Sequence, residues 1–357
     1  MANKRIFISD VHMGAGRAKD EGYNYEYDWL AKKEADNLAS FLNYIDTSSD
    51  TSEVILLGDI LDDWVCPVDK VPPTYDDIIN AEKNDNLVKS LKRLSANKAI
   101  KVVYLPGNHD MHVTKEFIYN NFPDMIYGGS AENMSVFTDG RLHAEHGSTH
   151  AMFNAPDLMN NYRKRLPLGY FISRVVATKV ALKGGEDRHY WKYLDDALEA
   201  MGPQSLPASV FEAVLEDADL PHDVKIHMPP IGGQPAHINA NDVNEMYKDL
   251  YAQWVESKGP AAAFHGVVAE LHLGRVADRL AKKGNTRIVV FGHSHSGTLD
   301  KDSLFVKDRI YANCGSWCEK NNATYIEYTK GIKKRMVRLM SWNGKKATQQ
   351  DKAELDR

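Results

Sequence analysis

Short apolar runs, each followed directly by polar residues, recur along the chain. The runs are rich in β-branched residues and stop at polar, glycine or proline positions, which is typical of strands buried on both faces of a sheet. We expect strands over residues 6–8, 54–57, 100–105, 141–145, 288–291 and 310–312. Apolar residues at helical spacing predict helices over about 28–45 and 78–94, between the first three strands. Strands that alternate with helices indicate an α/β fold.

The middle of the chain has a different pattern, in which helical spacing dominates. Proline and glycine clusters separate helices predicted over 170–182, 190–201, 209–215, 242–256 and 261–280. We interpret the chain as a sheet domain with an inserted, mostly helical cap and a polar, frayed C-terminal tail. These parts comprise 1–149 and 287–343 for the sheet domain, 150–286 for the cap, and 344–357 for the tail. Within the sheet domain, 323–328 and 336–342 predict a hairpin.

Composition and charge narrow the possible classes of protein. A length of 357 residues suits one α/β domain with a large insertion, and 43% hydrophobic with 26% charged residues exclude a disordered chain. The net charge of −5 argues against a general nucleic-acid binder. Three cysteines cannot build a disulfide framework, and no window of 18 apolar residues occurs. The N-terminus has no long apolar segment either, so we expect a cytoplasmic protein.

The polar clusters lie where parallel strands present ligand sites, at the carboxyl ends of the predicted strands. Their side chains are carboxylates, an amide and imidazoles, which bind divalent metals of intermediate softness. The candidate ligands are Asp10, His12, Asp59, Asn108, His146, His293 and His295. No cysteine is among them, which disfavours a structural zinc site.

The number and spacing of these ligands suit two metal ions. In Asp10-Val11-His12, alternate residues of an extended segment point the same way, so both side chains can bind one ion. A lone carboxylate such as Asp59 can bridge two ions. Two metals about 3.5–4 Å apart clamp a phosphate group and lower the pKa of bound water. The pattern therefore predicts hydrolysis of a phosphoester.

As an ordered set, the clusters resemble the motifs of the calcineurin-like metallophosphoesterases: D-x-H, G-D-x-x-D, G-N-H-[DE], a later histidine, and G-H-x-H. Here they read Asp10-Val11-His12, Gly58-Asp59-Ile60-Leu61-Asp62, Gly107-Asn108-His109-Asp110, His146-Gly147 and Gly292-His293-Ser294-His295. The segment from Asn313 to Trp317 is similar to the family's N-x-G-S-W strand. The resemblance covers about 1–150 and 287–330, but not the cap.

This resemblance implies a four-layer α/β/β/α sandwich of two mixed β-sheets, with the metals at one end. It assigns Asp10, His12, Asp59 and His295 to one metal, and Asp59, Asn108, His146 and His293 to the other. His109 would protonate the leaving group or stabilise the transition state, with Asp110 orienting its ring, and a hydroxide held between the metals would be the nucleophile. Manganese is the expected metal, and iron and zinc are alternatives.

One branch of the family is more similar than the others. The segment from Gly58 to Trp64, and an insertion directly after His146-Gly147, resemble the bacterial UDP-2,3-diacylglucosamine hydrolases. Those enzymes cleave a pyrophosphate in lipid A synthesis and hold acyl chains under a helical lid. This chain departs from that group at His109, where the group has arginine, at Ser148, where it has aspartate, and in its greater length.

The start of the predicted cap, residues 158–185, contains no acidic residue. Its basic residues are Arg163, Lys164, Arg165, Arg174, Lys179 and Lys183. One interpretation is a lid for an anionic, partly apolar substrate, or a peripheral membrane contact; the other is an ordinary amphipathic helix with a solvated basic edge. Arg163 and Arg165 are candidates for binding a substrate phosphate, because a guanidinium makes two parallel hydrogen bonds to it. His150 is a third candidate.

We expect a phosphodiesterase or pyrophosphatase that acts on a small nucleotide-diphosphate-linked or lipid-like molecule. A phosphomonoesterase or a nuclease on the same site, and a non-enzymatic binding protein, are the alternatives. A nuclease of the family would be expected to have a basic groove and a coiled-coil arm. The sequence has no long heptad run, which argues against such an arm.

Overall fold

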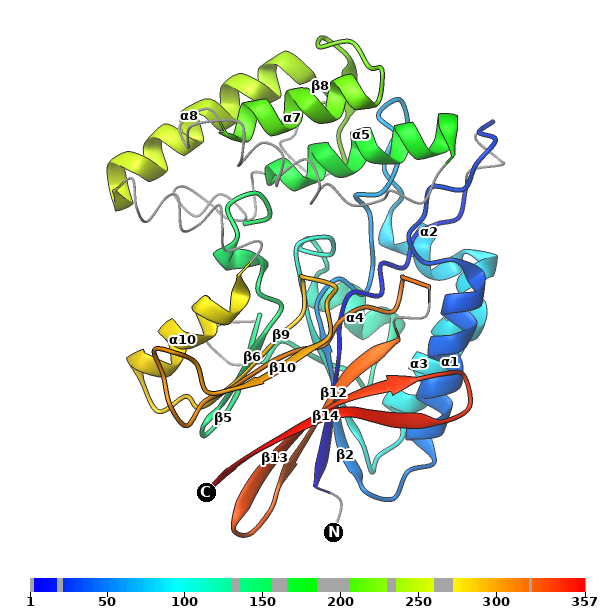
Figure 1. Cartoon of the computed structure of the whole chain (residues 1–357). Helices are drawn as coiled ribbons and strands as arrows, with labels where there is room; N and C mark the ends of the chain where they lie inside the picture. Colours follow the sequence, from blue (N-terminus) through cyan, green and yellow to red (C-terminus); the bar gives the residue numbers. More distant parts are fainter. Residues whose placement is uncertain are drawn as a thin grey trace.

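Two β-sheets packed face to face form the centre of the molecule, and three helices lie above one end of them (Figure 1). The computed structural model describes residues 3–17, 22–129, 135–155, 166–184, 206–229, 236–259, 272–320 and 323–356. Both chain ends lie at the end of the sandwich opposite these helices (Figure 1).

The larger sheet has seven strands in the order β14-β13-β12-β1-β2-β3-β4. Its parallel half consists of β1 (Lys4–Ile8), β2 (Thr51–Leu57), β3 (Lys101–Leu105) and β4 (Ile126–Tyr127). Its antiparallel half consists of β12 (Thr324–Lys330), β13 (Lys334–Trp342) and β14 (Ala347–Asp356). The predicted hairpin is therefore confirmed as β12 and β13, and β12 pairs antiparallel with β1.

The smaller sheet has five strands in the order β10-β11-β9-β6-β5. They are β5 (Val136–Asp139), β6 (Leu142–Glu145), β9 (Ile288–Phe291), β10 (Thr298–Lys301) and β11 (Ile310–Asn313). The central strands β6, β9 and β11 are parallel, and the outer two pair antiparallel. All six strands predicted from the apolar runs are thus present, in two mixed sheets.

The side chains of the strands alternate between two apolar layers. Phe7, Ile55 and Val103 pack against the smaller sheet. Their neighbours Ile6 and Val54 instead pack under helices α1 and α3. The helices on this side are α1 (Lys32–Asp46), α2 (Tyr75–Asn80), α3 (Asp85–Ala96) and α4 (Lys115–Asn121). With α10 (Leu273–Lys283) on the smaller sheet, these layers confirm the four-layer sandwich.

One predicted helix is interrupted. The segment expected to be helical over 78–94 contains the end of α2, a 3-10 turn η1 (Glu82–Asn84) and α3. The buried amide of Asn84 donates hydrogen bonds to the carbonyls of Ile78 and Gly14, both at 2.8 Å. These bonds stop the helix and fix it to the loop after β1.

The described part of the cap is helical, as predicted. It contains α5 (Leu168–Lys183), α7 (Leu206–Asp217), α8 (Ala240–Lys258) and a short hairpin of β7 (Lys225–His227) and β8 (His237–Asn239). Its apolar core includes Trp64 and Val68 from a loop of the sandwich, so the cap is packed onto the site loops. The helix predicted over 190–201 lies outside the described residues.

Helix α10 differs in position from the rest of the segment predicted as cap. Its residues Leu273, Val276 and Ala277 pack against Val289 and Phe291 of β9. The segment predicted as cap therefore includes a helix that covers the smaller sheet (Figure 1). The turn η2 (Ser148–His150) leads from β6 toward the cap.

The prediction of a frayed tail over 344–357 is wrong. Residues 347–356 form β14, which pairs along its length with β13, and Ala353 and Leu355 are buried against the sheets. The segment is polar because β14 is an edge strand, of which only one face and one end contact the core. An edge strand needs few apolar residues, so its sequence lacks the signal of the central strands.

The interpretation of 158–185 as an amphipathic helix is correct only for a basic edge at Lys179 and Lys183, within the described part of that segment. Helix α5 is buried on nearly all sides, and among the described residues no helix is long and apolar enough to cross a bilayer. Arg174 is 0% exposed, and its guanidinium donates hydrogen bonds to the hydroxyl of Tyr170 and to the carbonyls of Cys66, Pro67, Lys70 and His227. Lys179 and Lys183 pair with Asp217 and Asp219. The basic side chains therefore stabilise the cap itself.

We expect the substitution Arg174→Leu to lower the free energy of unfolding by about 3 kcal/mol or more, because it leaves several buried carbonyls without a donor. Urea denaturation monitored by circular dichroism measures this loss. Lys183→Ala on the same helix is the matched control, and it should cost at most about 1 kcal/mol, since it removes an exposed pair. Equal losses in the two variants would contradict the role of Arg174.

Candidate metal centre

All seven predicted ligands lie at the carboxyl ends of strands, where the two sheets meet. Asp10 and His12 follow β1, Asp59 follows β2 and Asn108 follows β3 in the larger sheet. His146 follows β6, and His293 and His295 follow β9, in the smaller one. All seven side chains are buried. Residues far apart in sequence therefore converge because both sheets end at the same place.

The first group of ligands is formed by Asp10, His12 and His295. The Nε2 atoms of His12 and His295 lie 3.0 Å apart, and Nε2 of His295 is 3.4 Å from Oδ1 of Asp10. Nε2 of His12 also lies 3.8 Å from Oδ2 of Asp59. Two imidazole nitrogens this close share at most one proton, whereas both lone pairs can point at one cation. The group therefore fits a divalent metal.

The second group is formed by Asp59, His146 and His293, which can share one ion. Nε2 of His146 lies 3.0 Å from Oδ2 of Asp59, and the buried Oδ1 of Asn108 has no hydrogen-bond partner. A buried polar atom without a partner is costly, and a bound cation would satisfy the oxygen of Asn108. Because Asp59 can also share an ion with Asp10 and His12, the residues fit two metals with one shared carboxylate.

The electrostatic environment favours positive charge at this place. Burial opposes the charged form of His146, but the carboxylates of Asp59 and Asp10 outweigh it and raise the pKa of His146 to about 10. Burial likewise opposes the charge of Asp59, yet His146 and His109 hold the pKa of its carboxyl well below the usual range. The site thus combines carboxylates with imidazole rings that become neutral ligands when they lose a proton, as a cation-binding site requires.

Most of the ligands have an unusual backbone conformation. Five of the seven lie in the left-handed region: Asp10 (φ 55°), His12 (φ 52°), Asp59 (φ 54°), His293 (φ 71°) and His295 (φ 55°). This conformation is uncommon outside glycine and costs free energy, so surrounding contacts must enforce it. Such strain concentrates at functional sites, where it aims side chains that an extended strand would direct elsewhere.

The glycines before Asp59 and Asn108 allow the loops to approach one another. A Cβ atom at Gly107 would lie 2.2 Å from Oδ1 of Asp59, and one at Gly58 would lie 2.6 Å from the ring of His146. Gly58 also has a φ of 85°. Any side chain at either position would push ligand residues apart.

The orienting role expected for Asp110 is wrong. Its buried carboxylate accepts hydrogen bonds from the backbone N–H groups of Asp59 (3.2 Å), Ile60 (2.9 Å), Leu61 (3.4 Å) and Gly107 (2.6 Å), and from the hydroxyl of Tyr104. Burial and the nearby charge of Asp59 raise the pKa of Asp110 to about 6. Asp110 therefore joins the loop after β2 to the loop after β3, and does not contact the ring of His109.

Asp62 takes the place beside His109 that was expected for Asp110. Its Oδ2 lies 3.0 Å from Nδ1 of His109 and 2.8 Å from Nδ1 of His12. Burial opposes protonation of His109, but the carboxylates of Asp62 and Asp59 outweigh it and raise the pKa of that ring. Trp64 stacks on the same ring at 4.2 Å. The second aspartate of the G-D-x-x-D motif was the available signal for this residue.

Two other contacts orient ligand rings, and neither was predicted from the sequence. Oε1 of Glu319 lies 3.2 Å from Nδ1 of His295, and the carbonyl of Leu57 lies 2.9 Å from Nδ1 of His146. Partners of this kind fix the tautomer of a ligand histidine and leave Nε2 for the metal.

The three predicted substrate contacts have different outcomes. Nε2 of His150 lies 2.9 Å from Oε1 of Glu145, which also contacts Nε2 of His143 at 2.8 Å. Burial opposes the charge of Glu145, but the two histidines lower its pKa to about 2. This nitrogen of His150 is thus occupied by a carboxylate. Arg163 and Arg165 lie outside the described residues.

Two groups of metal ligands that share a carboxylate, at the strand ends of a four-layer sandwich, define a metal-dependent hydrolase. The family model described as calcineurin-like phosphoesterase matches residues 4–297. The chain therefore belongs to the calcineurin-like phosphoesterase family.

The solved structures that resemble this chain are distant. A dimetal phosphatase from Danio rerio is 13% identical with a TM-score of 0.39, over 98% of each chain. Vacuolar protein sorting 29 from Cryptosporidium parvum is 10% identical with a TM-score of 0.34, over 99% of this chain and 98% of that chain. The calcineurin-like phosphoesterase YfkN from Bacillus subtilis is 10% identical with a TM-score of 0.28, over 99% of this chain and 90% of that chain. No curated protein matches the sequence.

We expect Gly107→Ala to remove most of the bound metal while the fold is retained, because the new methyl group would collide with Asp59. Metal content by inductively coupled plasma mass spectrometry, together with circular dichroism, measures both effects. Gly284→Ala is the matched control, since a Cβ atom there meets nothing within 4 Å. A Gly107→Ala protein with the metal content of the wild type would show that the loops tolerate the extra atom.

Proposed function

We propose that this protein hydrolyses a phosphodiester or pyrophosphate bond with the help of two divalent cations. The observation that carries the proposal is the pair of ligand groups that share Asp59, with Oδ1 of Asn108 buried and without a hydrogen-bond partner beside them. Asp10, His12 and His295 would hold one cation, and Asn108, His146 and His293 the other.

When bound, two such cations polarise the phosphate and lower the pKa of water, which supplies a nucleophile at neutral pH. The donor set of carboxylate, amide and imidazole favours manganese, with iron and zinc as alternatives. The buried position of the ligands excludes bulk water, so the charges of the site act on the phosphate in a medium of low polarity.

His109 is the proposed proton donor to the leaving oxygen. Asp62 lies against its Nδ1, which leaves Nε2 for the substrate. The carboxylates of Asp62 and Asp59 raise the pKa of the ring and so favour its protonated form, the form that a general acid needs. Trp64 stacks on one face of the ring and limits its rotation.

The position of the cap favours a substrate that is larger than the phosphate group itself. Trp64 contacts both His109 and Tyr170 of α5, with ring centroids 4.2 Å and 5.8 Å apart, so a group leaving at His109 departs close to the cap. We propose a nucleotide-diphosphate-linked or lipid-like substrate, with Arg163 and Arg165 as phosphate contacts. The likeness of 58–64 to the UDP-2,3-diacylglucosamine hydrolases supports the pyrophosphate. Three buried cysteines that form no disulfide favour the cytoplasm as the compartment.

We expect Asp59→Ala to abolish metal binding at both positions and to lower kcat/KM by about a thousandfold or more, because the shared ligand serves both ions. The assay measures metal content and the hydrolysis of p-nitrophenyl phosphate, bis(p-nitrophenyl) phosphate and ADP-glucose. Asp69→Ala, at an exposed carboxylate outside the site, is the control. Full activity of the wild type in EDTA would refute the proposal. Faster hydrolysis of p-nitrophenyl phosphate than of the other two substrates would show that the enzyme is a phosphomonoesterase.

We expect His109→Ala to lower kcat by about a hundredfold or more with metal retained, as loss of a general acid does. Asp62→Asn removes a carboxylate that raises the pKa of His109, so the alkaline limb of the kcat–pH profile should move to lower pH. The profile is measured with the metal content fixed by assay. An unchanged alkaline limb in Asp62→Asn would exclude His109 as the titrating donor, and loss of metal in His109→Ala would reassign that residue as a ligand.

A further inference from the structure

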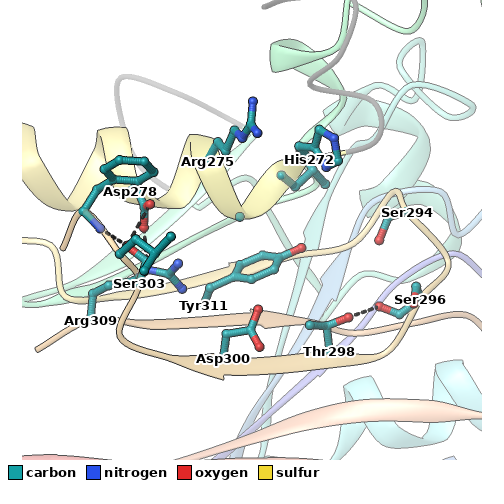
Figure 2. A pocket seen from close by; sticks show the side chains of 14 residues that line it. His272, Arg275, Asp278, Ser294, Ser296, Thr298, Asp300, Ser303, Arg309 and Tyr311 are labelled. Carbon is teal, nitrogen blue, oxygen red and sulfur yellow. Dashed lines mark hydrogen bonds and ion pairs between the residues drawn. The ribbon is translucent and has the colours of Figure 1, made fainter. Parts of the chain in front are cut away.

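A cavity separate from the metal ligands lies on the outer face of the smaller sheet, under the start of α10 (Figure 2). Its volume is about 630 Å³, within the range of small-molecule sites. The wall comes from α10, from β10 and β11, and from the loop between those two strands. None of the seven metal ligands lines it.

The cavity adjoins the metal centre through one loop. Ser294 lies between the ligands His293 and His295, Ser296 directly follows, and both serines line the cavity. Because successive Cα atoms are about 3.8 Å apart, this wall is one residue away from the metal ligands. A molecule in the cavity therefore lies beside the loop that carries them.

Hydroxyl groups dominate the end of the cavity near this loop. They belong to Ser294, Ser296, Thr298 and Tyr311 (Figure 2). Burial raises the pKa of Tyr311 to about 12, so its phenol remains a hydrogen-bond donor at neutral pH. Asp300, exposed on β10, adds a carboxylate with no ion pair to another described residue. Hydroxyls with one carboxylate suit a ligand that itself carries hydroxyl groups, such as a sugar or a ribose.

The cationic side of the cavity is provided by α10. Asp278 is neutralised, because it accepts hydrogen bonds from Nε of Arg309 at 2.7 Å and from the hydroxyl of Ser303 at 2.9 Å. Arg275 is exposed at the rim and has no ion pair within the part of the chain that the structure describes. An unpaired guanidinium beside a neutralised carboxylate can bind a phosphate group.

The opposite rim is apolar. Leu304 and Phe305 line the cavity from the loop between β10 and β11, and their exposed fractions are 95% and 70%. Large apolar side chains this exposed mark contact sites for ligands or partners. The ammonium of Lys282 lies over the Phe305 ring, 5.5 Å from its centroid, so an aromatic base can stack on the face of the ring that Lys282 leaves open.

We propose that this cavity binds a nucleotide, with the phosphate at Arg275, the ribose at the hydroxyl groups and Asp300, and the base at Phe305. We infer that this nucleotide is part of the substrate, and that inference rests on the proposed function. The cavity combines a cation, hydroxyl partners and an aromatic surface in one space of the right size, next to the loop of His293 and His295.

Binding is tested by calorimetry on the full-length protein in EDTA, which removes the contribution of the metals. AMP should bind saturably, and Arg275→Ala and Asp300→Ala should each weaken it by about tenfold, as loss of a charged contact does. Arg279→Ala, one turn further along α10 and outside the cavity, should leave the affinity unchanged. Absence of AMP binding, or equal affinity in all variants, would overturn the proposal.

The class of ligand is tested with glucose 1-phosphate and with Phe305→Ala. Phe305→Ala should weaken the binding of AMP by about fivefold or more, because one stacking contact is lost. The residue lies in an exposed loop, so we expect the fold to be unchanged. Ile332→Ala, at another exposed apolar residue outside the cavity, is the matched control. Equal affinity for AMP and glucose 1-phosphate, with no effect of Phe305→Ala, would show that the cavity binds sugar phosphates and does not recognise the base.

The link to catalysis is tested with the metal-loaded enzyme. Arg275→Ala should raise KM for ADP-glucose by about tenfold and leave the kinetics with bis(p-nitrophenyl) phosphate unchanged, because the second substrate has no nucleotide. Equal effects on both substrates would overturn the link. If the wild-type enzyme hydrolyses neither, the proposed function fails, whereas AMP binding in EDTA still decides the nucleotide site.

Discussion

The metal centre depends on a carboxylate that is not a ligand. Asp110 accepts hydrogen bonds from the backbone of two loops, one after β2 and one after β3, and so fixes the distance between Asp59 and Asn108. Both loops approach so closely that glycine is required where they meet. A buried carboxylate with several donors is a stable anchor, because each donor would otherwise lack a partner in the interior. The positions of the ligands thus follow from backbone hydrogen bonds, and the ligand side chains need not hold the loops together.

The cap is joined to the same loops by a different kind of contact. Trp64 lies between the ring of His109 and Tyr170 of α5, and the guanidinium of Arg174 binds carbonyls of the segment that follows Trp64. A cationic side chain is stable in this apolar core only because backbone carbonyls surround it. The proposed catalytic histidine and the cap therefore belong to one packed unit, so a displacement of α5 would change the position of the ring of His109.

The sequence predicted the central strands and the seven candidate ligands, because buried parallel strands have continuous apolar runs and their polar ends stand out. It did not predict β14, since an edge strand that contacts the core at one end has a polar composition. It assigned to Asp110 the place that Asp62 occupies, because the direction of a side chain in a loop is not encoded by spacing. Arg174 was interpreted as part of a basic surface for a similar reason: composition does not reveal which cation is surrounded by carbonyls.

The position of β14 at the edge of the larger sheet has a consequence for association between molecules. An edge strand presents unpaired backbone groups that could pair with the edge of another chain. Along β14, however, Gln349, Gln350, Asp351 and Lys352 are exposed, and Glu354 forms an ion pair with Lys334 of β13. Charged groups of both signs would have to lose water before a second strand could dock there. The polar composition of this strand therefore keeps the open edge of the sheet hydrated and opposes edge-to-edge aggregation.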